Sequence, residues 1–134
     1  MSAEKKVFHI NKELESSFGF AQAVQAGEFL FVSGTVSSDD ELQPLEQGNI
    51  EGQYRVIYEK LKRTLNAYDL TFNDVVKENI YTEDLEAFFG PGNAVRMEYY
   101  QGLDYYPTAT AVECSKIAFE GNLVEIELVA HISG

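Results

Sequence analysis

The stretch "NLVEIELVAHI", residues 122–132, decides the fold of this chain. Apolar residues recur at every second position, as they do in a β-strand whose side chains alternate between two faces of a sheet. One face is wholly apolar and carries Val124, Ile126, Leu128, Ala130 and Ile132. The other mixes apolar and charged groups and carries Leu123, Glu125, Glu127, Val129 and His131. We therefore expect a strand that packs its apolar face against helices and presents Glu125 on the opposite face.

The mixed face is unusual for a strand that borders water, because a solvated face is usually polar throughout. It is typical of a surface partly covered by another subunit that leaves a polar crevice. Glu125 then has two interpretations. It is either an ordinary solvent-facing or salt-bridged acid, the more frequent case, or a carboxyl in a partly closed pocket, where desolvation raises the pKa toward neutrality. The pattern alone leaves both open.

The rest of the chain supplies helices and further strands around this one. Residues 28–36, "EFLFVSGTV", predict a strand, and residues 37–49 predict a loop with Pro44 and Gly48. A long helix follows, with Asn49 as its N-cap. Its apolar face recurs at three- and four-residue spacing: Ile50, Tyr54, Ile57, Leu61, Leu65 and Tyr68.

The C-terminal half alternates strands and helices. Residues 75–83 predict a strand, and Pro91 begins a second helix over residues 91–102. Residues 107–114, "PTATAVEC", predict a closely packed strand that forms a final pair with residues 122–132. This order predicts a single domain, 1–134, of the α+β class: a two-layer sandwich with one sheet and two helices on one face.

Composition narrows the classes of function. The chain carries a net charge of −12, which repels phosphate backbones and anionic lipid, so we expect neither nucleic acid nor a membrane as partner. The N-terminal residues lack the apolar core of a secretory signal, and a cytoplasmic location is expected. No Cys/His spacing suggests zinc, so no metal or cofactor is expected. Cys114 alternates with Ala109 and Ala111 and is expected to be a small buried side chain.

Five segments in order resemble the RidA/YjgF family: "GEFLFVSGTV", "VVKENIYTEDLEAFF", "GNAVRMEYY", "YPTATAVEC" and "NLVEIELVA". The likeness runs from about Phe18 to Ala130. It implies a chorismate-mutase-like α+β fold with a mixed sheet, and a homotrimer that binds small molecules in clefts between subunits.

The resemblance also implies an activity, the hydrolysis of reactive 2-imino and 2-enamino acids to 2-oxo acids and ammonia. Such a reaction needs an anchor for the substrate carboxylate, a group that exchanges protons and a positioned water. By position, Glu125 matches the glutamate that serves the water or the proton. Ser33, with Gly34 beside it, matches a cleft serine, and Asn93 in "GNAV" matches a cleft asparagine.

Three departures from the family pattern affect the expected ligand site. Ala109 stands where active members have the arginine that holds the substrate carboxylate, Phe20 replaces a cleft tyrosine, and Ala111 replaces a cysteine. Losing a charge-assisted contact costs ~1.5–3 kcal/mol, which slows turnover of a 2-imino acid at least about tenfold. The only arginines of the chain lie on the expected helices, and none obviously replaces the missing one: Arg55, Arg63 and Arg96.

Several functions stay open on this basis. One is a divergent enzyme that uses Glu125 as acid and base on a different imine or a neutral electrophile, in a pocket made more apolar by Phe20, Ala109 and Ala111. Another is a non-catalytic or regulatory trimer that holds a small metabolite, and a third is a purely structural or partner-binding role. A ribonuclease activity, attached to some family members, disagrees with the charge of −12.

Overall fold

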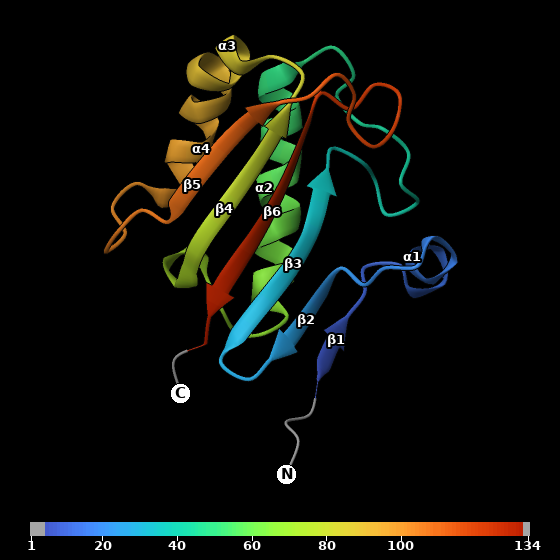
Figure 1. The fold of residues 1–134 in the computed structure, drawn as a ribbon, viewed down its shortest axis with the longest axis vertical. Helices are drawn as coiled ribbons and strands as arrows, with labels where there is room; N and C mark the ends of the chain where they lie inside the picture. Colours follow the sequence, from blue (N-terminus) through green and yellow to red (C-terminus); the bar gives the residue numbers. More distant parts are fainter. Residues whose placement is uncertain (1–4, 133–134) are drawn as a thin grey trace.

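The computed structural model of the chain describes residues 5–132 and contains one six-stranded sheet in the order β1-β2-β3-β6-β4-β5 (Figure 1). β4 and β5 run parallel and every other neighbouring pair is antiparallel, so the sheet is mixed, as expected. The strands are β1 (Lys6–Phe8), β2 (Ala23–Ala26), β3 (Phe29–Val36), β4 (Val75–Thr82), β5 (Thr108–Glu113) and β6 (Val124–His131). The helices are α1 (Lys12–Phe18), α2 (Ile50–Asn66), α3 (Leu85–Ala87) and α4 (Asn93–Tyr100).

β6 lies at the centre of the sheet and confirms the alternation read from its sequence. Val124, Ile126, Leu128 and Ala130 are buried, while the residues between them are half-buried. The prediction that the last two strands pair with each other is wrong, because β4 lies between β5 and β6. The helical connection from β4 to β5 makes that pair parallel, and β6 then enters antiparallel between β3 and β4.

Helices α2 and α4 cover one face of the sheet, so the expected two-layer α+β architecture is confirmed (Figure 1). α2 begins as predicted, because the Asn49 side chain accepts a hydrogen bond from the Gly52 amide at 3.1 Å. The apolar face of α2 packs on the sheet through Tyr54, Ile57 and Leu61, each fully buried. Within residues 5–132 no helix combines the length and apolar character that a membrane span needs.

The second helix differs from the prediction over residues 91–102. α3 is followed by a wide turn, Phe88–Gly92, which contains Pro91, and regular helix begins only at Asn93. Pro91 lacks an amide proton, so the turn widens around it. A Cβ atom on Gly92 would lie 2.6 Å from the Tyr54 ring, so glycine lets this turn approach α2 closely.

Strand β5 also departs from expectation, since most of its side chains are exposed rather than closely packed. It forms an edge of the sheet, with β4 on one side and no strand on the other among the described residues. Cys114, expected to be buried, follows this edge strand and is half-buried for the same reason.

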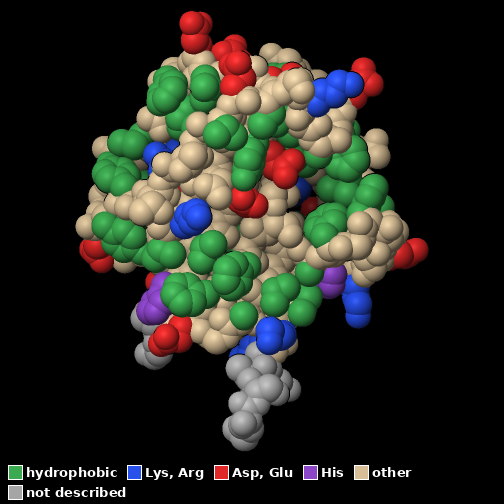
Figure 2. All heavy atoms as spheres, viewed as in Figure 1, with side chains coloured by type: hydrophobic (Ala, Val, Ile, Leu, Met, Phe, Trp, Pro, Cys, Tyr) green, Lys and Arg blue, Asp and Glu red, His purple; other side chains and the backbone are tan. Residues whose placement is uncertain are grey.

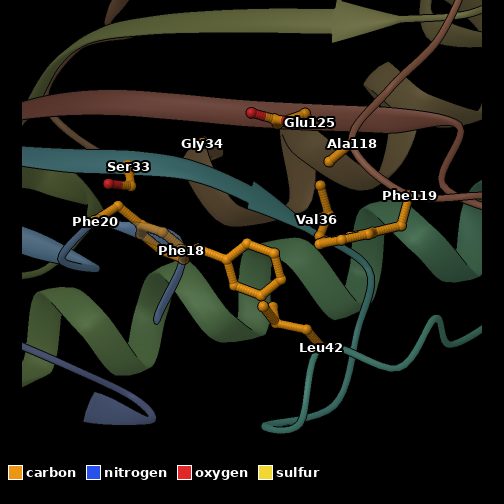
Figure 3. Close-up of a pocket in the computed structure, with 9 residues that line it drawn as sticks. All are labelled: Phe18, Phe20, Ser33, Gly34, Val36, Leu42, Ala118, Phe119 and Glu125. Atoms are coloured by element: carbon orange, nitrogen blue, oxygen red, sulfur yellow. The ribbon is translucent and has the colours of Figure 1, made fainter. Parts of the chain in front are cut away.

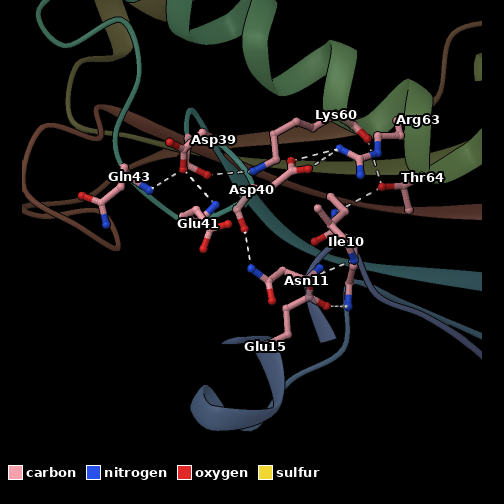
Figure 4. A network of polar contacts seen from close by, with 12 residues as sticks. Ile10, Asn11, Glu15, Asp39, Asp40, Glu41, Gln43, Lys60, Arg63 and Thr64 are labelled. Carbon is pink, nitrogen blue, oxygen red and sulfur yellow. Dashed lines mark hydrogen bonds and ion pairs between the residues drawn. The ribbon is translucent and has the colours of Figure 1, made fainter. Parts of the chain in front are cut away.

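Helix α1 was not predicted, because a polar network rather than an apolar stripe holds it in place, to one side of the sheet (Figures 1 and 4). The buried Glu15 carboxylate collects four hydrogen bonds, from the amides of Ile10, Asn11 and Gln22 and from the ring of His9. Asn11 also donates to the Asp40 carbonyl, and Asp40 pairs with Arg63 of α2 at 3.0 Å. The network therefore ties α1 to the loop after β3 and to α2.

A buried ion pair links α4 to the sheet. Arg96 Nε donates to Glu78 Oε1 at 2.8 Å, and the same oxygen accepts from Tyr58 at 2.9 Å. Tyr100 donates to the second oxygen, and its ring lies 5.1 Å from the guanidinium carbon of Arg96. Burial and the Glu78 charge raise the pKa of both tyrosines, so both remain hydroxyl donors. Every contact of this carboxylate is thus a charge-assisted hydrogen bond.

Arg96→Met tests the importance of this pair for stability. The change leaves a buried carboxylate without its cation, which costs about 3–5 kcal/mol of the free energy of unfolding. Urea denaturation measures the loss. Arg55→Met is the matched control, because Arg55 pairs with Glu98 at 3.1 Å on the surface and should lose far less. Equal losses in the two variants would contradict the account.

Candidate functional site

The candidate site is a cavity of about 360 Å³ beside β3 and β6 (Figure 3). It brings together four of the residues singled out from the sequence: Phe20, Ser33, Gly34 and Glu125. Phe18 and the loops after β3 and β5 complete the lining. The residues that sequence reasoning missed are Phe18, Val36, Leu42, Ala118 and Phe119.

A β-bulge positions the floor of the cavity. The register between β3 and β6 shifts between Val32 and Thr35, so Ser33 and Gly34 lie in the irregular part of the strand. The Ser33 amide donates to the Gln22 carbonyl at 2.9 Å, and its hydroxyl donates to the Ala21 carbonyl at 2.6 Å. The bulge is thereby fixed to the chain segment that carries Phe20.

Gly34 makes room for the Glu125 carboxyl group. A Cβ atom on Gly34 would overlap that carboxyl, with the carboxyl carbon only 2.8 Å away. Any larger residue at this position would push the acid away from the bulge. The pair of Gly34 and Glu125 thus defines where the carboxyl lies in the cavity.

The two acids of β6 that share the mixed face have different surroundings. Glu127 accepts hydrogen bonds from Asn79 at 3.1 Å and from Tyr81 at 2.9 Å. The Glu125 carboxyl, in contrast, accepts no hydrogen bond from any side chain or backbone amide of residues 5–132. Burial raises the pKa of Glu125, and the negative charge of Glu127 raises it further. Of the two acids, Glu125 is the one free to exchange a proton with a bound molecule.

Aromatic side chains form the walls opposite this acid. Phe18 and Phe119 meet edge to face, with ring centroids 6.0 Å apart, although they lie far apart in the sequence. Phe18 is the last residue of α1, and Phe119 belongs to the loop between β5 and β6. Neither segment has a periodic pattern, so the sequence carried no signal that the two rings would meet.

The remaining predicted site residues do not reach this cavity within one chain. Asn93 begins α4, where its side-chain oxygen accepts a hydrogen bond from Arg96 at 3.3 Å. Ala109 pairs in register with Glu78, and Ala111 with Ile80, so both point to the helix-covered side of the sheet. Glu125 lies on the opposite side. Any role for these three residues at Glu125 therefore requires a second copy of the chain.

All three arginines of the chain form ion pairs outside the cavity. Arg55 pairs with Glu98, Arg63 with Asp40 and Arg96 with Glu78. The residues that line the cavity, all within the described part of the chain, include no lysine, arginine or histidine. The cavity therefore offers a carboxyl group, a serine hydroxyl and an apolar wall.

The sequence of the chain is similar to those of known proteins. A family model described as Endoribonuclease L-PSP matches residues 10–132. A RutC family protein of Pyrococcus horikoshii is 34% identical over 112 residues, which cover 84% of this chain and 86% of that protein. A 2-iminobutanoate/2-iminopropanoate deaminase of Mus musculus is 29% identical over 126 residues, 94% of this chain and 90% of that protein.

The fold agrees with these sequence matches. The crystal structure of RidA from an Antarctic Psychrobacter superposes with a TM-score of 0.75 at 30% identity, over 85% of this chain and 89% of that one. Sequence and fold thus agree over nearly the whole length, and the chain belongs to the RidA/YjgF family.

Proposed function

We propose that the chain binds a small molecule in the Glu125 cavity and hydrolyses an imine, an enamine or a related reactive metabolite there. The observation that carries the proposal is the half-buried Glu125 carboxyl, which has no hydrogen-bond partner among residues 5–132 and faces an apolar cavity. A group with a raised pKa can take up and release a proton under mild conditions. The mouse relative named as a 2-iminobutanoate/2-iminopropanoate deaminase supports the reaction class.

Imine hydrolysis needs one group that acts first as a base and then as an acid. The Glu125 carboxylate removes a proton from water as the water oxygen bonds to the imine carbon, which forms a carbinolamine. With a protonated imine as the substrate, the protonated carboxyl then gives its proton to the carbinolamine nitrogen. As the carbon–nitrogen bond breaks, the carboxylate takes the hydroxyl proton and the carbonyl forms, and the departing ammonia takes up that proton and leaves as ammonium. Ser33 Oγ can accept a hydrogen bond from the reacting N–H, because its own proton is given to the Ala21 carbonyl.

We propose that a homotrimer completes the site. The helix-free face of the sheet exposes large apolar side chains, including Phe29, Phe31 and Val112, with Phe31 50% exposed (Figure 2). Large apolar side chains exposed on one face of a sheet favour burial against another subunit. In such an assembly, Asn93, Ala109 and Ala111 of a neighbouring copy would border the Glu125 cavity.

A second function is favoured by one specific observation. Ala109 stands at the family's arginine position, and the arginines of this chain all pair with other carboxylates. A trimer that retains the cavity without the usual anchor could bind a metabolite and not transform it. The partner in both cases is a small molecule, and neither function calls on nucleic acid, a membrane, a metal or a cofactor.

An imine-hydrolysis assay distinguishes these functions. An oxidase generates the imine in place, semicarbazide traps it, and loss of the trapped adduct reports hydrolysis. Glu125→Gln should slow the reaction at least about 100-fold, because the proton-transfer group is lost. Glu127→Gln, on the same strand and face, is the control that should retain activity. Absence of hydrolysis across several imines would contradict the enzymatic proposal and favour the binding function.

The pH dependence of kcat/KM should report the ionisation of Glu125. Because the base form starts the reaction, activity should rise as Glu125 loses its proton, with an acid limb above the ordinary glutamate pKa of about 4.3. In Glu127→Gln this limb should move to lower pH, since one negative charge next to Glu125 is removed. An unmoved limb would show that another group controls the rate.

The same raised pKa predicts an effect on stability. The pKa of Glu125 is higher in the folded chain than in the unfolded chain, so the folded chain binds this proton more tightly. The contribution of Glu125 to the free energy of unfolding is therefore present below the unfolded pKa and lost as the pH rises through the folded pKa. Glu125→Gln should therefore raise the melting temperature at pH 7, and the gain should fade toward about pH 4. A gain that persists in acid would contradict the sign of the shift.

A further inference from the structure

The hydrogen-bonding groups of the cavity determine what kind of ligand it can hold. Its lining contains two side chains with polar atoms, Ser33 and Glu125. The single hydroxyl proton of Ser33 is given to the Ala21 carbonyl at 2.6 Å, so only its lone pairs face the cavity. An ionised Glu125 is also purely an acceptor. Both polar side chains therefore require a donor on the ligand.

The charge around the cavity opposes an anionic ligand. Glu125 lies within the cavity, Glu127 follows on the same face of β6, and the chain as a whole carries −12. A second copy of the chain would bring no unpaired arginine, because each guanidinium is held by a carboxylate of its own chain. A carboxylate next to Glu125 would meet like charge without a guanidinium to offset it.

The rest of the cavity suits a ring or a short apolar chain. Phe18, Phe20, Phe119, Leu42 and Val36 contribute to the lining. A cavity of about 150 Å³ holds one benzene molecule, so the volume of about 360 Å³ here accommodates a ring with a short polar arm. The polar arm would reach the acceptors at Ser33 and Glu125, and the ring would lie against the phenylalanines (Figure 3).

From these three observations we propose that the cavity selects a ligand with an apolar, preferably aromatic, body and an N–H donor, cationic or neutral, and that it rejects carboxylates. This selectivity specifies the substrate class of the proposed function, and the reaction at this site rests on that proposed function. The substrate would then be an imine without a carboxylate, R–CH=NH₂⁺, which reacts with water to give R–CHO and NH₄⁺. Oxidation of a primary amine is the class of reaction that supplies such an imine.

Calorimetric binding at pH 7.5 tests the selectivity without any turnover, using probes that share one ring. Benzylamine is the cation, benzyl alcohol the neutral donor and phenylacetate the anion. Benzylamine should bind at least about tenfold more tightly than phenylacetate, since one charge contact is worth about 1.4 kcal/mol or more. Equal or tighter binding of phenylacetate, or no binding of benzylamine at millimolar concentration, would overturn the inference.

Two substitutions locate the selectivity in the cavity. Glu125→Gln should remove most of the preference for benzylamine over phenylacetate and leave benzyl alcohol binding nearly unchanged. Glu127→Gln, which removes a more distant charge, should keep most of the preference. Ala118→Lys adds a cation to the cavity wall and should shift the preference toward phenylacetate. A preference that survives Glu125→Gln would place the binding of benzylamine elsewhere and refute the inference.

Turnover separates the inference from the proposed function. Phenethylamine and phenylalanine, each oxidised in place by its own oxidase, give imines that differ in the carboxylate. Faster hydrolysis of the phenethylamine-derived imine supports both. The benzylamine preference without hydrolysis of either imine supports the selectivity and refutes the enzymatic function. Faster hydrolysis of the phenylalanine-derived imine supports the enzyme and refutes the selectivity.

Discussion

The pairing of β6 with both β3 and β4 is the constraint on which the rest of the structure depends. The side chains of β6 alternate between the two faces of the sheet, which places Ile126 and Leu128 under the helices and Glu125 on the opposite face. A shift of one residue would bury the acids and expose the core. A bulge in β3 shifts its register with β6, and there Gly34 admits the Glu125 carboxyl. The register of the sheet and the geometry of the cavity thus have a common origin.

Two carboxyls on adjacent strands, Glu78 of β4 and Glu125 of β6, have opposite surroundings. Glu78, on the helix-covered face, receives three hydrogen bonds, from Arg96 and two tyrosines. Glu125, on the other face, has a raised pKa and an apolar surrounding. The first arrangement holds the carboxyl with three hydrogen-bond donors, and the second leaves the carboxyl free to exchange a proton with a bound molecule. This contrast is the physical basis for assigning structure to Glu78 and chemistry to Glu125.

The sequence predicted those parts of the molecule that follow from local periodicity. The alternation of β6, the apolar stripe of α2 and the Asn49 cap are visible in neighbouring residues and were confirmed. Helix α1 depends on Glu15 collecting donors from several segments, and the cavity wall depends on two rings from unrelated loops. Such contacts have no local signature. Within one chain, Asn93 and Ala109 lie away from the cavity that holds Glu125.

The most direct test of this account is the ionisation of the Glu125 carboxyl itself, followed by carbon-13 NMR across a pH titration and assigned with Glu125→Gln. We expect an inflection above the ordinary glutamate value of about 4.3, because burial and the Glu127 charge both favour the protonated form of Glu125. An inflection at or below the ordinary value would mean that the carboxyl is solvated or paired. It would remove the basis for acid–base chemistry in this cavity.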